Sequence, residues 1–285
     1  MQLLRRRWRS ALLFGLSMLF LSGCGQIVVL NPQGPVAKEE LRLITWSFGL
    51  MMIVVIAVFV LFGYMLIKYR AKPGKNSDYQ PEQEGNRMLE TVWTVVPILI
   101  IIALIIPTIK ITYALVKPPT AGTPVVVNVT SANWKWIFQY PGHGIETVNY
   151  VVIPANRPVE FQLDAIGPMN SFWVPALGGQ EYSMPGMTMR LWLEAGHSGT
   201  FVGRSANFSG RGFVHMVFNV VAKDQNQYDA WLQNVKTTAP AMTIADYNRL
   251  MAQNVMPTMT FSSIINGTKG GSMNAMNMTS SSSNS

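Results

Sequence analysis

Cysteine is nearly absent from this chain, which limits the covalent and metal chemistry open to it. One residue of the 285, Cys24, is a cysteine. A disulfide needs two thiols, and a thiolate metal centre needs several. Neither can form within a single copy of this chain.

Charged residues are also scarce, while hydrophobic ones are abundant. Only 13% of the residues are charged and 49% are hydrophobic, which favours a membrane protein over a soluble one. The net charge of +8 comes from the first ten residues, from the region around 68–75 and from scattered positions. The sequence has no basic stripe with interleaved aromatic residues, so nucleic acid is not an expected partner.

The N-terminus has the layout of a secretory signal. A basic cluster at 5–9 precedes a short apolar run at 11–20, and Leu21-Ser22-Gly23-Cys24 resembles a bacterial lipobox. We therefore expect a lipoprotein signal peptide over 1–23, acylation of Cys24 on the outer face of the membrane, and an external segment over 24–42. The alternative is a plain signal anchor with an incidental cysteine.

Two long apolar runs predict a transmembrane hairpin. The first, 43–67, and the second, 91–115, can each span about 30 Å of hydrocarbon at about 1.5 Å per residue. Pro97 and Pro107 interrupt the second run, and such prolines are tolerated where a neighbouring helix satisfies the freed carbonyl. The loop 68–90 contains several Lys and Arg residues, which places it in the cytoplasm and both chain ends outside.

The pattern changes after residue 122 to short β-branched and aromatic segments broken by Gly, Pro and Asn. These segments predict an antiparallel β-sandwich over 123–222. A helical extension over 223–262, peripheral to the sandwich, and a disordered tail over 263–285 complete the chain. The predicted strands are 125–130, 134–140, 147–153, 159–164, 171–175, 189–194, 200–204 and 213–221.

A loop in the second half, 203–216, reads Gly-Arg-Ser-Ala-Asn-Phe-Ser-Gly-Arg-Gly-Phe-Val-His-Met. With the segment 170–175, Asn-Ser-Phe-Trp-Val-Pro, and the apolar hairpin, it resembles subunit II of the haem-copper terminal oxidases. In that family the loop supplies Cys-x-Glu-x-Cys, a histidine and a methionine, and the upstream segment supplies a histidine, to a dinuclear copper centre. The corresponding positions here are Asn170, Ser205, Asn207, Ser209, Phe213 and Met216.

The resemblance implies a subunit that binds no metal. Serine hydroxyls stay protonated near neutral pH and are poor ligands for Cu(I), and every position except Met216 has lost its ligand. The quinol-oxidising branch of the family, which includes the menaquinol oxidases of Gram-positive bacteria, takes electrons from a donor inside the membrane. Loss of this copper is then no loss of function.

The resemblance also implies a fold, a function and a set of partners. The external domain would be a cupredoxin-like Greek-key sandwich on a multi-pass, lipid-anchored chain of the bacterial cell membrane. The chain would be a non-catalytic subunit II of a quinol oxidase, an oxidoreductase of the respiratory chain that reduces oxygen to water and translocates protons. It would hold no cofactor, because the haems and copper would belong to subunit I. Its implied partners are subunit I, small membrane subunits, quinol and membrane lipid, and not cytochrome c.

Two other groups of residues lie in the predicted strands. Trp134 and Trp136 flank Lys135 and alternate with it, so both indoles are expected to pack on one face of a strand and the lysine to point to the other. His215 lies two residues from the position of the family's ligand. It is adjacent to Met216 on a predicted strand, where neighbouring side chains point to opposite faces, so the pair is not expected to bind copper.

Glu90 stands at the start of the second apolar run, where an ionisable side chain lies either at headgroup level or on a proton path. Arg87 and the helix N-terminus favour an interfacial carboxylate. The resemblance implies the other role, because a glutamate matching this position lies at the cytoplasmic mouth of a proton channel of subunit I. We therefore expect Glu90 to be a proton-entry residue.

The sequence is also compatible with a different class of function. The chain could be a membrane-anchored lipoprotein whose sandwich binds an external partner. The hairpin argues against it, because a lipid-tethered domain needs no additional helices, whereas an oxidase subunit must pack on a membrane partner.

Overall fold

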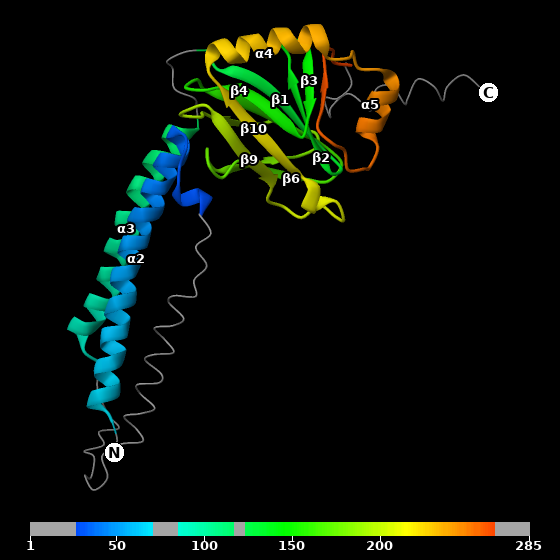
Figure 1. Cartoon of the computed structure of the whole chain (residues 1–285). Helices are drawn as coiled ribbons and strands as arrows, with labels where there is room; N and C mark the ends of the chain where they lie inside the picture. Colours follow the sequence, from blue (N-terminus) through cyan, green and yellow to red (C-terminus); the bar gives the residue numbers. More distant parts are fainter. Residues whose placement is uncertain (1–26, 71–84, 117–122, 266–285) are drawn as a thin grey trace, which may run out of the picture.

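The chain folds into a long helical hairpin that projects from a β-sandwich (Figure 1). The computed structural model describes residues 27–70, 85–116 and 123–265. The signal peptide expected over 1–23, the lipidation site Cys24, most of the loop 68–90 and nearly all of the tail 263–285 lie outside the described residues.

Two helices form the hairpin. A 3-10 turn, η1 (Val28–Leu30), precedes α2 (Pro35–Lys68), and α3 (Arg87–Leu115) lies beside α2 (Figure 1). Each is long and apolar enough to cross a membrane, and its apolar stretch is not buried inside the structure, unlike the core helix of a soluble protein. The hairpin is therefore a candidate membrane anchor, and the sandwich lies at one of its ends.

Helix α2 begins at Pro35 rather than at residue 43, because its first turns dock on the sandwich. Proline suits the first position of a helix. Val36 and Ala37 are buried there, and the Ala37 backbone N–H donates to the Leu177 carbonyl at 3.1 Å. The first N–H groups of a helix have no partner within the helix, and the sandwich supplies one. The part of the expected external segment from Pro35 to residue 42 is thus helical.

Helix α3 also begins earlier than residue 91. The side chain of Asn86 accepts hydrogen bonds from the backbone N–H groups of Met88 at 3.0 Å and Leu89 at 3.2 Å. Asparagine is a strong N-cap because it satisfies these otherwise free donors. The cap sets the start of the helix at Arg87.

The helix continues through both of its prolines. Pro107 has no N–H to donate to the carbonyl of Ala103, one turn earlier. The indole Nε1 of Trp46 on α2 donates to that oxygen at 3.3 Å. A neighbouring helix therefore satisfies a carbonyl freed by proline, as the sequence predicted.

The external domain is a sandwich of two sheets. Its strands are β1 (Val125–Ala132), β2 (Lys135–Tyr140), β3 (Ile145–Val148), β4 (Tyr150–Pro154), β5 (Val159–Ile166), β6 (Asn170–Trp173), β7 (Gln180–Ser183), β8 (Met189–Leu193), β9 (Gly199–Ser205), β10 (Val217–Lys223) and β11 (Met259–Phe261). The sheets have the orders β11-β3-β2-β1-β5-β8 and β4-β10-β9-β6-β7. The pairs β1/β5 and β4/β10 are parallel and the rest antiparallel, so the predicted sandwich is confirmed but is not wholly antiparallel.

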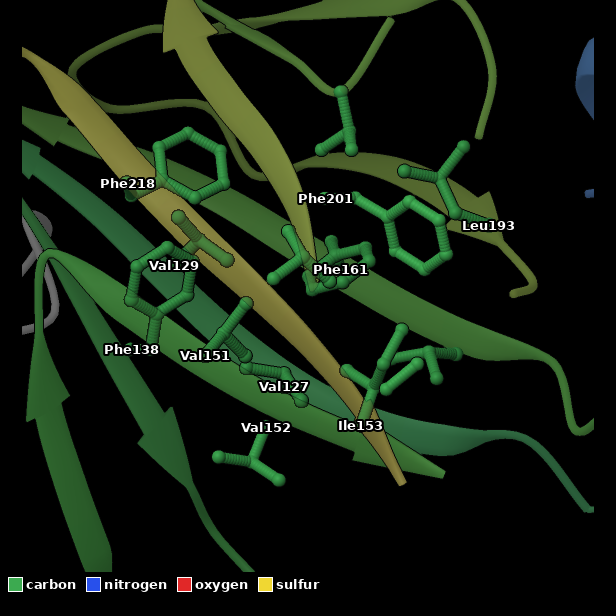
Figure 2. Packing of buried hydrophobic residues seen from close by; sticks show 14 of the residues in the cluster. Val127, Val129, Phe138, Val151, Val152, Ile153, Phe161, Leu193, Phe201 and Phe218 are labelled. Carbon is green, nitrogen blue, oxygen red and sulfur yellow. The ribbon is translucent and has the colours of Figure 1, made fainter. Parts of the chain in front are cut away.

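Aromatic and branched side chains from both sheets fill the space between them (Figure 2). Phe172 and Phe218 stack with ring centroids 4.9 Å apart, and Trp136 meets Phe172 edge-on at 5.4 Å. Burial of each such large apolar side chain stabilises the folded state by about 1.5–3 kcal/mol. This core positions the loop 203–216, since β9 and β10 flank that loop.

Local conformation explains where the predicted strands were wrong. Asn149 has a φ of 58° and divides the expected strand 147–153 into β3 and β4. Residues Phe213–His215 form a 3-10 turn, η2, so the strand expected over 213–221 begins only at Val217. The short strands β7 and β11 were not predicted.

The C-terminal extension is part of the domain rather than peripheral to it. Helix α4 (Gln225–Thr238) covers one end of the sandwich (Figure 1) and contributes Tyr228, Leu232 and Val235 to the core. Helix α5 (Ile244–Met251) is capped by Thr243, whose side chain accepts a hydrogen bond from the Asp246 backbone N–H. A second cluster joins the extension to the outer face of one sheet, so the folded domain continues past residue 222.

Candidate functional site

The loop 203–216 is closed at its base by the sheet. It leaves β9 after Ser205 and returns through η2 to β10. The backbone N–H of Ser205 donates to the Met216 carbonyl at 2.9 Å, and Ala206 N–H donates to the Ser171 carbonyl at 3.2 Å. The second bond ties the loop to β6, whose first residue is Asn170. The two segments that the sequence singled out are therefore neighbours in space.

Side chains at the expected ligand positions bond to one another. Ser205 Oγ donates to Asn170 Oδ1 at 3.3 Å, and Ser209 Oγ donates to Met216 Sδ at 3.4 Å. Asn207 Nδ2 donates to the Met169 carbonyl at 3.2 Å, directly before Asn170. The structure thus brings five of the six positions together by neutral contacts.

Asn170 is buried, and its amide group is held on its other side as well. Its Nδ2 donates to the Pro168 carbonyl at 3.0 Å and to Ser131 Oγ at 3.4 Å, and Ser131 Oγ lies 2.9 Å from Ser183 Oγ. A buried amide needs such partners, because unsatisfied polar groups are costly. Asparagine here has a structural role in joining the two sheets.

Phe213, at the position of the loop histidine, packs on an aromatic neighbour. Its ring lies 5.6 Å from that of Phe208, which is 76% exposed. His215 in the same turn is exposed, while Met216 is buried at 1% exposure. The two side chains diverge, as predicted, although they do so on a 3-10 turn and not on a strand.

Two tryptophans donate hydrogen bonds to backbone carbonyl groups of the loop. Trp134 Nε1 donates to the Ser209 carbonyl at 3.1 Å, and Trp136 Nε1 donates to the Met216 carbonyl at 3.4 Å. Gly212 lies so close to Trp134 that a Cβ at this position would be 2.1 Å from the indole. Core packing is confirmed for Trp136, and both indoles also shape the loop.

The donor set does not fit a dinuclear copper centre. The positions carry hydroxyl, amide and phenyl groups and one thioether, and most of the polar ones are already bonded to protein groups. Copper centres of this kind require thiolate and imidazole ligands. No group of three or more His, Cys, Asp and Glu residues suited to a metal occurs within 27–70, 85–116 and 123–265.

Glu90 lies on the first turn of α3, at the end of the hairpin far from the sandwich (Figure 1). Its side chain is exposed, and its backbone N–H donates to the Asn86 carbonyl at 2.9 Å. The Thr94 hydroxyl donates to the Glu90 carbonyl at 2.8 Å. Glu90 and the sandwich therefore lie at opposite ends of the hairpin.

Two buried ionisable residues were not foreseen. Lys135 is fully buried and its ammonium donates to the carbonyls of Asn133 at 3.2 Å and Ala252 at 2.7 Å, and to Asn254 Oδ1 at 2.8 Å. Burial lowers the pKa of Lys135 to about 8. The lysine does point away from Trp136, as alternation predicted, but the C-terminal extension covers that face.

Glu146 is the second such residue. Gln139 Nε2 donates to Glu146 Oε2 at 2.7 Å, while Oε1 is buried without a hydrogen-bond partner among the described residues. Burial raises the pKa of this carboxyl to about 7, and the bond from Gln139 opposes that shift. The only sequence signal was a polar residue within short apolar strands, which is too common to single out.

Comparison with known proteins finds relatives across most of the chain. Residues 27–111 match the transmembrane domain of cytochrome c oxidase subunit II, and residues 141–224 match its periplasmic domain. A quinol oxidase subunit 2 from Bacillus cereus is 54% identical over 269 residues, covering 92% of each chain. Another from Bacillus subtilis is 46% identical over 247 residues, covering 85% of this chain and 77% of the relative. The solved periplasmic domain of a Bradyrhizobium japonicum cytochrome oxidase subunit II aligns with 20% identity and a TM-score of 0.40, covering 42% of this chain and 98% of that one.

Proposed function

The chain belongs to the cytochrome c oxidase subunit II family, and we propose that it serves as subunit II of a quinol-oxidising haem-copper terminal oxidase without a redox metal of its own. Family membership and the relatives named quinol oxidase subunit 2 support the assignment. The observation that carries it is the pair of neutral contacts, Asn170 with Ser205 and Ser209 with Met216, at the copper-ligand positions.

The identity of the electron donor explains why this chain would need no redox metal. Quinol is dissolved in the membrane and can deliver electrons to the haems and copper of a partner subunit I directly. An external electron port for cytochrome c is then unnecessary. The sandwich keeps a structural role, and its contacts with α2 and α3 hold it against the end of the hairpin. Glu40 Oε1 on α2 accepts from the Gly179 N–H at 2.8 Å, and Trp192 Nε1 donates to the carbonyl of Leu115, at the end of α3, at 2.7 Å.

Glu90 is the proposed proton-entry residue. Its exposed carboxylate at the far end of the hairpin can take up protons from water on that side of the membrane and pass them to a partner subunit. The Lys and Arg residues of the adjacent loop support a cytoplasmic location for that end. Glu90 would contribute proton access, while chemistry at oxygen would take place in the partner.

Cys24 is the proposed lipidation site. The lipobox-like sequence supports it, and the hairpin makes the lipid dispensable for anchoring. In a Cys24→Ser variant, lipid attachment should be lost while the chain stays in the membrane fraction. Release of that variant into the soluble fraction would contradict the assignment of the two spans.

The test of the proposed function is purification of the tagged full chain from membranes. The purified material should carry haem, consume oxygen with quinol as donor, and fail to oxidise reduced cytochrome c. A colourless protein without membrane partners would instead support the lipoprotein binding module. If the complex oxidised cytochrome c as fast as it oxidises quinol, the proposal that quinol is its electron donor would be wrong.

A further inference from the structure

A groove runs along the outer part of α2, on the end nearest the sandwich. Its volume is about 730 Å3, and its lining includes Lys38, Arg42, Trp46, Gly49 and Ile53. These positions are spaced by three or four residues, so they follow one face of the helix. The lining is cationic at one end and apolar along the rest.

The floor of the groove lies at Gly49, which has no side chain. A Cβ built on Gly49 would meet no atom within 4 Å, so nothing in the described structure fills this space. Trp46 forms a wall between the helices, and with Arg42 it also lines a neighbouring groove of about 440 Å3 against Ala103 and Pro107 of α3. The indole is held there by its bond to the Ala103 carbonyl.

The length of the groove along the α2 axis matches the thickness of the hydrocarbon layer of one leaflet. From Arg42 to Ile53 the helix rises about 16 Å at about 1.5 Å per residue. Half of a roughly 30 Å hydrocarbon core is about 15 Å. Because the sandwich is external and the uninterrupted apolar run begins at Leu43, Arg42 falls at the level of the outer headgroups and Ile53 near the middle of the membrane.

Charge complementarity identifies the occupant. Lys38 and Arg42 lie one turn apart at the mouth, and both are exposed. Of the nearby acids, Glu40 turns toward the Gly179 N–H, and Glu39 reaches Arg42 only at 3.4 Å between side chains that are 43% and 76% exposed. Such a surface ion pair contributes little, so an incoming anion can compete for the guanidinium.

We propose that this groove binds one phospholipid of the outer leaflet with an anionic headgroup. Its phosphate contacts Lys38 and Arg42, and one acyl chain lies over Gly49 between Trp46 and Ile53. Acyl chains fit the apolar walls, and a phosphate fits two cations one helical turn apart. The diacylglycerol of a lipidated cysteine carries no phosphate and would leave the cations unused. This inference does not depend on the electron donor of the enzyme.

The experiment measures lipid retained by the full chain, purified with its membrane partners and reconstituted in nanodiscs. The nanodiscs contain phosphatidylcholine with a minor fraction of phosphatidylglycerol, and lipid that survives re-extraction is quantified by mass spectrometry. The fraction of phosphatidylglycerol in the retained lipid should exceed its fraction in the nanodiscs. Lys38→Gln and Arg42→Gln should each lower its retention about fivefold. Gly49→Leu should displace both lipids by filling the groove.

Two matched controls lie outside the groove on the same hairpin. Gly63→Leu changes a second α2 glycine whose Cβ would also meet no atom, and Lys110→Gln removes a cation near the outer end of α3. Both variants should retain phosphatidylglycerol like the unaltered chain. Retention in proportion to supply, or an equal loss in Lys110→Gln, would overturn the proposal. Release of partner subunits by Gly49→Leu with lipid retention unchanged would show that the groove is a protein interface, which also overturns it.

Discussion

The indole N–H of Trp46 on α2 donates to the carbonyl oxygen of Ala103 on α3, across 3.3 Å. Pro107 leaves this carbonyl without its helical partner. In a bilayer no water is available to replace that partner, so a second helix must do so. The contact therefore compensates a defect in α3 and fixes the axial alignment of the hairpin.

Replacement of Trp46 by phenylalanine should destabilise the hairpin by about 1 kcal/mol, because interhelical hydrogen bonds in membranes are worth about 0.6–1.7 kcal/mol. The measurement is unfolding of the detergent-solubilised chain in a denaturing detergent titration. Pro107→Ala provides the control, since alanine returns an N–H to the Ala103 carbonyl. In that background the cost of Trp46→Phe should shrink. An unchanged cost would mean that Trp46 acts through packing alone.

The ligand positions should regain copper if they are rebuilt together. The combined change is Asn170→His, Ser205→Cys, Asn207→Glu, Ser209→Cys and Phe213→His, and the fragment should cover 123–265, because the extension belongs to the core. Since hydrogen bonds already bring Asn170, Ser205, Asn207 and Ser209 together, we expect stoichiometric copper with a mixed-valence spectrum, and none in the unaltered fragment. A rebuilt fragment that folds without taking up copper would show that the loop has lost the required shape.

Glu146 should make the external domain less stable as pH rises through the range just below neutral. Its folded pKa, about 7, lies above the ordinary value of 4.5. The folded state therefore holds the proton more tightly, and the stability that this provides is full below pH 4.5 and is lost as pH rises through 7. The loss amounts to at most about 3 kcal/mol.

Glu146→Gln should flatten this part of the pH dependence, because an amide keeps the shape and cannot ionise. The readout is denaturant unfolding followed by tryptophan fluorescence at pH 5 and pH 7.5. Asp229→Asn removes an exposed carboxylate from α4 and should leave the slope in place. An identical slope in Glu146→Gln and the unaltered chain would contradict the assignment.

Glu90→Gln should slow quinol-driven oxygen consumption severalfold, because an amide cannot relay protons. The Asn86 cap uses backbone N–H groups of Met88 and Leu89, so α3 should still form. Haem content and subunit composition are the controls for assembly, and Glu90→Asp, which keeps the carboxylate, should restore part of the rate. Full turnover in an assembled Glu90→Gln complex would reduce this residue to a surface charge.

Residue chemistry and local pattern accounted for much of this protein. The apolar runs predicted the hairpin, and the short β-branched segments predicted the sandwich. The loss of thiolate and imidazole donors at positions such as Ser205 and Ser209 pointed to a copper-free loop. The hairpin and the sandwich required only residue types and their spacing along the chain, whereas the copper-free loop also required the resemblance to the oxidase subunit family.

The tertiary structure decided what depends on contacts between distant segments. Whether residues 35–42 are helical depends on the docking of Val36 on the sandwich, which no local propensity encodes. The extension looked peripheral because its helices are short and polar, yet Tyr228 and Leu232 complete the core. Lys135 is buried only because residues 252–254 return to cover it. Burial is set by which surfaces meet in three dimensions, and strand alternation gives a side chain's direction but not what lies over it.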